Sequence, residues 1–346
     1  DSLFYSQFFP VDSSMLVTDS AHFSVLRNEI YLTSYAQGRK SGISVKRKFY
    51  FLAGVKHDLY KYSQYVFDTA FQNLSCELDI SWKPFDFVQL RARSEYGVYG
   101  YHEGDGAIWP EITFYGKSKR FLLHINSMFT STTPPLDVLR YHTKHIDWNN
   151  QFDAENTKVM KVRFEIPGRR FALYANYFSF GNYIYYDMQA LPQQQPGMTE
   201  VAEFGIEKSM NWRHLHLDTK TAYQHSYNEE LLSIPELVTC NSLYFEGPMF
   251  RKAVLVRLGV DVLYYSKYYP DAWMPLIRQY YLQGEKEVGN YPYAGALLAV
   301  KISNVRIFFR ANHPYAGLMG YQYYGTPHHP MPDRTFRFGI NWRFFD

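Results

Sequence analysis

Two histidines and an aspartate at alternate positions form the arrangement with the clearest chemical potential. His214, His216 and Asp218 would point to one face of an extended strand, since side chains two residues apart share a face. Imidazoles beside a carboxylate can bind a metal ion or serve acid–base chemistry. The sequence places no further ligand or nucleophile with them, so we interpret them as solvated side chains, and His328 and His329 likewise. We predict no metal and no cofactor.

No sequence motif supports catalysis. The chain contains no G-x-S-x-G, H-E-x-x-H, Walker loop or dinucleotide fingerprint. A hydrolase that uses His214 and Asp218 ranks last among the alternatives, and it would require an activity that disappears in His214→Ala. We therefore expect a protein that is not an enzyme.

The elements that must position these residues are strands with one oily face and one charged face. Such alternation recurs along nearly the whole chain, whereas no sustained 3.6-residue period appears. In the last run, Phe336, Phe338, Ile340, Trp342 and Phe344 alternate with Arg337, Gly339, Asn341 and Arg343. The runs from 254 and from 305 repeat this pattern, which predicts an all-β protein.

Composition narrows the environment of these strands. The 346 residues have a mean hydropathy of −0.36, and no stretch of eighteen apolar residues is present, which excludes a helical membrane protein. Aromatic residues make up 19% of the chain, with 32 Tyr and 27 Phe, and these residues favour strands and membrane–water interfaces. The net charge of +3 is not gathered into a basic run, so we expect no nucleic-acid partner.

Three features predict membrane strands rather than a soluble sandwich. The strands are about ten to fourteen residues long, which suits a tilted membrane crossing. Tight turns alternate with long loops along the chain. Trp82, Trp212 and Trp342 each fall beside a tight turn or the C-terminus, where they would form an interfacial girdle.

The charged faces would then line a water-filled lumen, because a charged side chain that faces lipid at mid-membrane costs ~2–4 kcal/mol. A basic wall is expected from the C-terminal strands: Arg257, Lys301, Arg306, Arg310, Arg337 and Arg343. A mixed wall is expected from the others: Glu77, Asp79, Arg91, Arg93, Glu95, Lys161, Arg163, Glu165, His214, His216 and Asp218. Two interpretations stay open, namely ion-pair ladders that brace the barrel and a transverse field that tunes ion passage.

Strand parity predicts the topology, because barrels of this kind have short periplasmic turns and longer outer loops. Inner turns are expected at 37–42, 83–85, 116–119, 167–168, 210–211, 246–251 and 303–304, and outer loops at 131–156, 267–292 and 313–333. Fifteen strands follow from about residue 24, and an even count adds one over 2–10. The prediction is one closed antiparallel barrel of about sixteen strands with both termini periplasmic, forming a single domain over 1–346.

The C-terminal third resembles a known family in its phrases. These are YFEGPMF at 244–250, YYPDAWMP at 268–275, GNYPY at 289–293 and RFGINWRFFD at 337–346. They are similar to the β-barrel porin family of Bacteroidetes-type outer membranes. The resemblance implies a Gram-negative outer-membrane location and a channel role, with no catalytic residues. Since family members are longer, we expect an upstream segment to precede residue 1: either a leader has been removed or the numbering starts inside a longer precursor.

The predicted function is passive diffusion of small hydrophilic solutes or ions, with a weak preference for anions. The alternative is a structural or accessory barrel of a larger outer-membrane complex, with an occluded lumen and loops that contact other outer-membrane proteins or a second copy. The apolar loop 267–292 would narrow the pore, cover the mouth or bind a partner barrel. Cys76 and Cys240 lack metal-ligand spacing and are expected to be small buried or lipid-facing residues.

Overall fold

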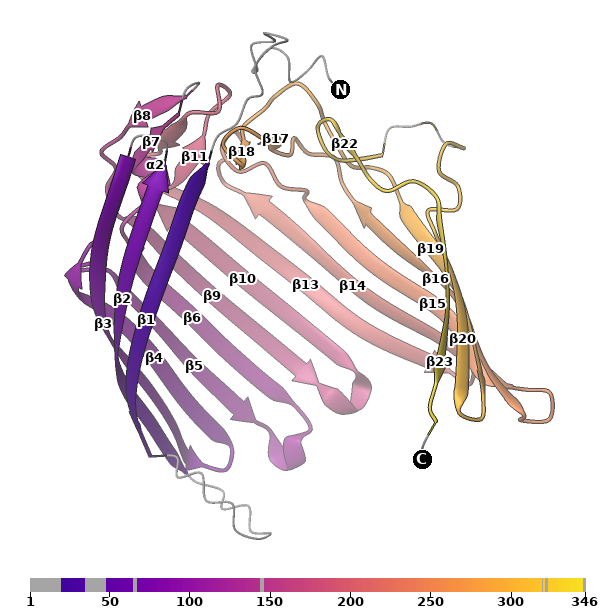
Figure 1. Ribbon diagram of the computed structural model, residues 1–346. Helices are drawn as coiled ribbons and strands as arrows, with labels where there is room; N and C mark the ends of the chain where they lie inside the picture. The colour runs from indigo at the N-terminus through magenta and orange to yellow at the C-terminus, as the bar shows by residue number, and fades with distance from the viewer. Residues whose placement is uncertain are drawn as a thin grey trace.

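The computed structural model describes residues 20–34, 48–64, 67–143, 146–318, 320 and 323–344. Its main feature is one curved antiparallel sheet of fifteen tilted strands, each hydrogen-bonded to the next in chain order (Figure 1). The all-β prediction and the fifteen strands from about residue 24 are therefore confirmed. No helix in these ranges is long and apolar enough to cross a membrane. The strands are β1 (Ala21–Thr33), β2 (Phe49–Gln64), β3 (Phe67–Phe85), β4 (Val88–Gly100), β5 (Gly106–Tyr115), β6 (Leu122–Thr132), β9 (Glu155–Ile166), β10 (Phe171–Gly181), β13 (Met198–Trp212), β14 (Leu215–Ser226), β15 (Leu237–Met249), β16 (Val254–Tyr265), β19 (Tyr293–Ile302), β20 (Val305–Asn312) and β23 (Thr335–Trp342).

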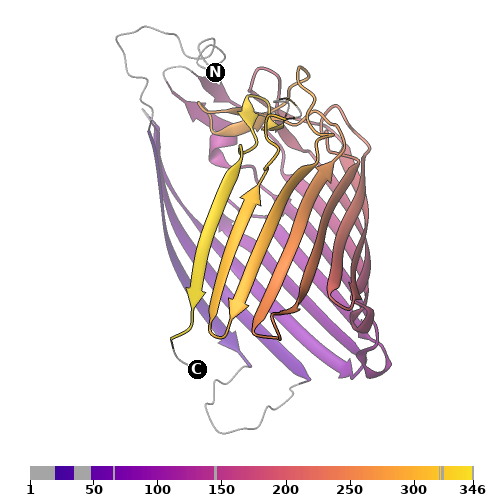
Figure 2. The same cartoon turned by 90° about the vertical axis from the view of Figure 1, so that its right-hand side faces the viewer.

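Short and long connections lie at opposite ends of the sheet (Figures 1 and 2). The turns that follow β3, β5, β9, β13, β15 and β19 lie at one end, and the three predicted outer loops lie at the other. The long connections contain short strands and one short helix. These are α2 (Leu136–Leu139), β7 (Arg140–His142), β8 (Asp147–Asn149), β11 (Ile184–Tyr186), β12 (Pro192–Gln194), β17 (Ala272–Met274), β18 (Gln279–Tyr281), β21 (Tyr324–Thr326) and β22 (His329–Pro330), while 3-10 turns occur at Lys117–Lys119 and Pro167–Arg169.

Three predicted turns are displaced along the chain. The turn expected at 83–85 lies at 86–87, because Pro84 is accommodated at a bulge within β3 and does not end the strand. The turn expected at 210–211 is the two-residue hairpin Arg213–His214, where Arg213 adopts a left-handed φ of 54°. The turn expected at 246–251 lies at 250–253, since Gly247 and Pro248 still pair with β16. The turn expected at 37–42 falls outside the described residues.

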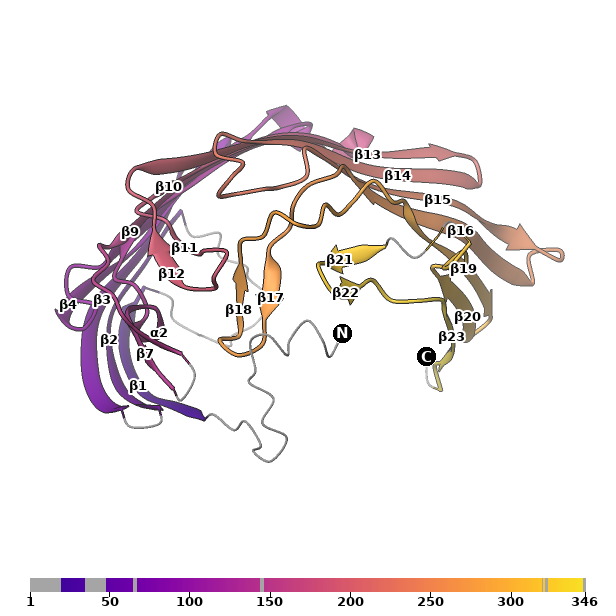
Figure 3. The same ribbon diagram turned by 90° about the horizontal axis from the view of Figure 1, so that it is seen from above.

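The two edge strands, β1 and β23, are not paired with each other in the part of the chain that the structure describes. Seen from above, they face the same opening in the curve of strands (Figure 3). Every residue of β1 is exposed. The strand predicted over 2–10 lies outside the described residues, so the closure of the barrel stays a prediction.

Candidate functional site

Most charged side chains of the sheet lie on its concave face, whereas the register places Lys61, Lys158, Glu200 and Lys208, near strand ends, on the opposite face. Directly paired residues on neighbouring strands point to the same side, and the register links the polar positions of one strand to those of the next from β1 to β23. Two contacts identify that side. The Gln64 side chain accepts a hydrogen bond from the His142 backbone N–H, and the Tyr265 hydroxyl donates to the Tyr324 carbonyl. Both partners belong to long connections that lie inside the curve (Figure 3).

The opposite, convex face exposes large apolar side chains. Leu258, Phe338 and Ile340 are each more than half exposed, and they alternate with residues of the concave face. A contiguous apolar surface of this kind indicates contact with lipid or protein. The register thus separates an oily outer face from a polar inner one along the whole sheet.

The predicted basic wall occupies one side of the concave face, on β16, β19, β20 and β23 and just beyond β23. Arg257 lies 3.8 Å from Glu246, and Arg310 lies 3.3 Å from Asp261, so these two cations have acidic neighbours. Within the described ranges, the other four have no carboxylate within ion-pairing distance. Those four are Lys301, Arg306, Arg337 and Arg343, and three of them border one cavity near the tight-turn end. Uncompensated positive charge is therefore concentrated on this wall.

The predicted mixed wall is neutralised by short ion pairs between strands. Arg91 forms a two-bond pair with Asp79, with distances of 3.0 and 2.7 Å, and Lys56 pairs with both Glu95 and Glu77. Further along the sheet, Arg163 pairs with Glu165 and with Glu207, which Lys220 also approaches at 3.2 Å. Arg93 lies over the Trp109 ring and Lys161 over the Phe178 ring, so these cations contact aromatic faces. Both interpretations of the charged faces thus find support, each on a different wall.

The predicted histidine group does not assemble. His214 was expected on the polar face of a strand, but the hairpin places it in the turn, with Nδ1 3.2 Å from the Glu246 carbonyl. His216 does lie on the concave face, where it stacks on Tyr244 and hydrogen-bonds the Asn211 amide. Asp218 lies on the same face. His214 is thus separated from His216 and Asp218, and the three side chains do not form one group.

The three predicted girdle tryptophans gather at the tight-turn end of the convex face. Trp82, Trp212 and Trp342 are each about half exposed and stand within a few residues of the turns after β3, β13 and β19. Phe85 and Phe87 flank Trp82 at the same end and stack on each other. Exposed aromatic rings at one level suit a membrane–water boundary.

Three long connections pack together into a loop cap, which we define as residues 133–143, 146–154, 182–197 and 266–292. Its buried centre contains Trp148, Ala190, Ala272, Met274, Ile277 and Tyr281. Tyr141 stacks on Trp148, and its hydroxyl donates to the Leu276 carbonyl, while the Leu282 N–H donates to the Tyr186 carbonyl. From above, the small strands of the loop cap lie inside the curve of the long strands (Figure 3). The predicted outer loop 267–292 therefore packs over the concave side.

A second loop cluster surrounds His313, which is fully buried. Its Nε2 lies 2.6 Å from the Tyr291 hydroxyl and its Nδ1 3.0 Å from the Pro332 carbonyl, and the rings of Tyr315 and Tyr323 pack against it. This cluster fixes the connection between β20 and β23. His313 carries no signal in the sequence, because its burial depends on Tyr291 and Pro332, which lie about twenty residues before and after it in the chain.

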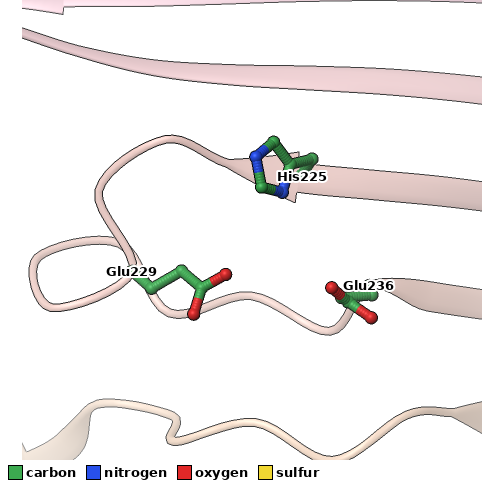
Figure 4. Close-up of side chains that lie close together, drawn as sticks. All are labelled: His225, Glu229 and Glu236. Atoms are coloured by element: carbon green, nitrogen blue, oxygen red, sulfur yellow. The ribbon is translucent and has the colours of Figure 1, made fainter.

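One group of possible metal ligands lies outside the concave face, at the end of β14 and the connection to β15. One donor atom each of His225, Glu229 and Glu236 lies within 4.8 Å of the others (Figure 4). Glu229 and Glu236 are exposed, and a structural zinc site takes four ligands, whereas this group offers three. The group depends on how the connection after β14 folds back, so it could not be predicted from the sequence.

The fold is shared with receptors and a transporter of known structure. A ferric enterobactin receptor and a siderophore receptor of Pseudomonas aeruginosa match 93% and 94% of this chain with a TM-score of 0.63, at 12% and 10% identity. An iron transporter of Neisseria meningitidis matches 94% with a TM-score of 0.63 at 11% identity. The chain spans only 54–56% of the length of these three structures.

At the level of sequence, no curated protein matches the chain. The family described as "putative porin" matches it from residue 1 to residue 346. This agrees with the resemblance seen in the C-terminal third and extends it over the N-terminal two thirds. The chain belongs to this porin family.

Proposed function

We propose that the protein is an outer-membrane channel for passive diffusion of small hydrophilic solutes and that it weakly prefers anions. The observation that carries this proposal is the division of the sheet into an apolar convex face and a continuous polar concave face. A sheet of this size encloses water when it closes, since its interior is too wide for side chains to fill. Membership of the porin family supports a channel in the outer membrane, and the receptors and the iron transporter that share the fold support a role in transport.

The anion preference rests on the imbalance between the two walls. Short ion pairs cancel most of the charge of the mixed wall, whereas Lys301, Arg306, Arg337 and Arg343 have no acidic neighbour among the described residues. Fixed charges act over about 10 Å at 0.1 M salt and about 3 Å at 1 M. The preference should therefore be measurable at 0.1 M and fade at 1 M.

Reversal potentials across a salt gradient in planar bilayers test both parts of the proposal. We expect the triple variant Arg306→Gln, Arg337→Gln and Arg343→Gln to conduct but to lose the anion preference. The double variant Arg310→Gln and Asp261→Asn removes one paired cation with its anion, so its ion preference should stay that of the unaltered protein. Cation selectivity of the unaltered protein would refute the role of the basic wall.

A second function, an accessory barrel with an occluded lumen, is favoured by the loop cap over the concave side. The same recordings separate the two functions. A purified protein that stays silent in bilayers and co-purifies with another outer-membrane protein would support the accessory role. In both cases we infer that the loop cap lies at the cell surface and the tight turns in the periplasm, as in barrels generally.

A further inference from the structure

We propose that the basic wall holds a binding site for the phosphate group of a small dissolved solute, at the tight-turn end of β19, β20 and β23 (Figure 1). The site is a cavity of about 400 Å³ on the concave face. Its lining contains three cationic side chains, Lys301, Arg306 and Arg343, together with the neutral polar side chains of Ser303 and Asn341. The inference rests on the proposed function in requiring a wet concave face, and it names a class of anion that the basic wall binds.

The hairpin of β19 and β20 and the end of β23 bring the three cations together. Lys301 is directly paired with Arg306, which is in turn paired with Asn341 on β23. The Arg343 N–H donates to the Asn304 carbonyl at 3.0 Å, so the pairing continues past β23 and Arg343 shares the face of Asn341. Directly paired residues have Cβ atoms about 4.5–5.5 Å apart, which places long basic side chains within reach of one small anion.

Two of these cations repel each other. Like charges in directly paired positions destabilise a sheet, and a counter-ion between them offsets the repulsion. On the mixed wall, Glu77 and Glu95 are such a pair, and Lys56 contacts both carboxylates. Lys301 and Arg306 are such a pair on the basic wall, but no carboxylate among the described residues lies within ion-pairing distance of either. An anion from solution would supply here the counter-ion that the protein itself supplies on the mixed wall.

The Phe308 side chain separates this cavity from the rest of the basic wall. Its ring lies over Gly339, where a Cβ atom would come within 2.5 Å of the ring. Arg310 and Arg337 pair with each other on the far side of Phe308 and do not border the cavity. Arg310 also has Asp261 as an acidic neighbour, at 3.3 Å. The three cations of the cavity therefore form a local cluster.

The donors of the cavity determine the class of ligand. No acidic side chain of the described residues lines it, and Glu246 borders only the neighbouring cavity, where it lies 3.8 Å from Arg257. A phosphate monoester carries about −1.5 to −2 charges at pH 7 and three strong acceptor oxygens, which suits a cluster of three cations. Arginine binds phosphate through two parallel N–H donors, whereas a halide accepts no such pair.

The position of the cavity indicates the source of the phosphate. The cavity lies on the concave face, away from the apolar convex face, so its ligand is a dissolved phosphate and not a lipid headgroup. Small-molecule sites usually have volumes of about 300–1,000 Å³, so the cavity has room for more than the phosphate group itself. Inorganic phosphate and a sugar phosphate are both suitable probes.

The test is a ligand-observed ³¹P NMR titration of the full chain in a phosphorus-free detergent, with inorganic phosphate and glucose 6-phosphate at constant ionic strength. We expect saturable binding of both probes. Arg306→Gln removes a hydrogen bond between charged groups, so it should weaken binding by about 10- to 150-fold. Phosphate should also raise the unfolding temperature of the unaltered protein and leave that of Arg306→Gln unchanged. If Arg306→Gln does not fold, Arg343→Gln removes another cation of the cavity and should weaken binding similarly.

The matched control is Arg337→Gln, which removes the same charge from the same wall on the far side of Phe308. A diffuse field would be weakened equally by Arg337→Gln and Arg306→Gln, whereas a site is weakened only by the second. We therefore expect Arg337→Gln to bind phosphate like the unaltered protein.

Three results would overturn the inference. These are the absence of saturable binding, equal weakening by Arg337→Gln and Arg306→Gln, and binding that is lost in bilayers containing phosphatidylglycerol, which would assign the cavity to a lipid headgroup. A conducting protein that does not bind phosphate contradicts this inference alone. A silent protein that binds phosphate contradicts the channel alone.

Discussion

Opening the loop cap is the most direct way to ask whether it controls passage through the lumen. Trp148 is its central residue, because the ring stacks on Tyr141 at 4.6 Å, meets Tyr186 edge-on at 6.2 Å and donates from Nε1 to the Asp137 carbonyl at 3.0 Å. It is 8% exposed. Trp148→Ala should destabilise the packed cap by about 3–5 kcal/mol, the usual cost of truncating a buried Trp, which raises the open population by about 10²- to 5 × 10³-fold.

Two assays report the result separately. Protease added to intact cells should cut the variant within 133–154 far faster than the unaltered protein, and single channels in planar bilayers should show a larger conductance. Trp148→Phe keeps an aromatic ring on Tyr141, so its cleavage rate and conductance should lie between those of Trp148→Ala and of the unaltered protein. Trp342→Ala, on the convex face at the tight-turn end, should change neither the cleavage rate nor the conductance. If the cap is released but conductance does not change, the cap does not obstruct the ion path. Cleavage seen only in permeabilised cells would invert the inferred orientation.

Two further predictions concern the faces and edges of the sheet. The two native cysteines lie on opposite faces of the sheet, since Cys76 follows Ser75 of the concave face, whereas Cys240 pairs with Lys220 and borders a cavity on the concave face. A membrane-impermeant thiol reagent should therefore modify Cys240 and spare Cys76. The reverse labelling would show that the two faces are exchanged. In lipid bilayers, the backbone amide hydrogens of 21–33 and 335–342 should be as protected from exchange as those of β10, because a strand edge in hydrocarbon must be hydrogen-bonded to another strand. Fast exchange at alternate residues would show that the edges are open.

Local patterns in the sequence predicted the strands well, because alternation depends only on neighbours along the chain. The turn at Ser303 and Asn304 lies where it was predicted, between β19 and β20. Turn positions failed where a turn-forming residue type sits in a strand, as with Pro84 at its bulge and Asn211 opposite His216. In those cases cross-strand pairing outweighed local preference.

Features that depend on contacts between distant segments were not predictable. Trp148 and Met274 belong to the same buried cluster although they are far apart in the chain, and the sequence analysis could offer only three alternatives for the loop that contains Met274. The difference in net charge between the basic wall and the mixed wall also depends on distant contacts. A count of charges shows an excess of basic residues, but only the strand register reveals which cations are paired with a carboxylate.

Among the described residues no strand pairs with the outer edge of β1 or of β23, and this is the strongest physical argument for closure. In an antiparallel edge strand, every second residue directs its N–H and C=O away from its partner. β1 has thirteen residues, so about six such residues would face hydrocarbon if its edge stayed open. Each unsatisfied group costs several kcal/mol in lipid, which sums to far more than the ~5–15 kcal/mol that stabilises a folded domain. A single added strand, such as the one predicted over 2–10, closes the sheet only if the two edges approach within two strand spacings, about 10 Å. The edges of an open sheet can adjust to that spacing, because the strands can change their tilt and curvature. Closure therefore sets the width of the lumen. The width in turn determines how strongly Lys301, Arg306, Arg337 and Arg343 act on a passing ion.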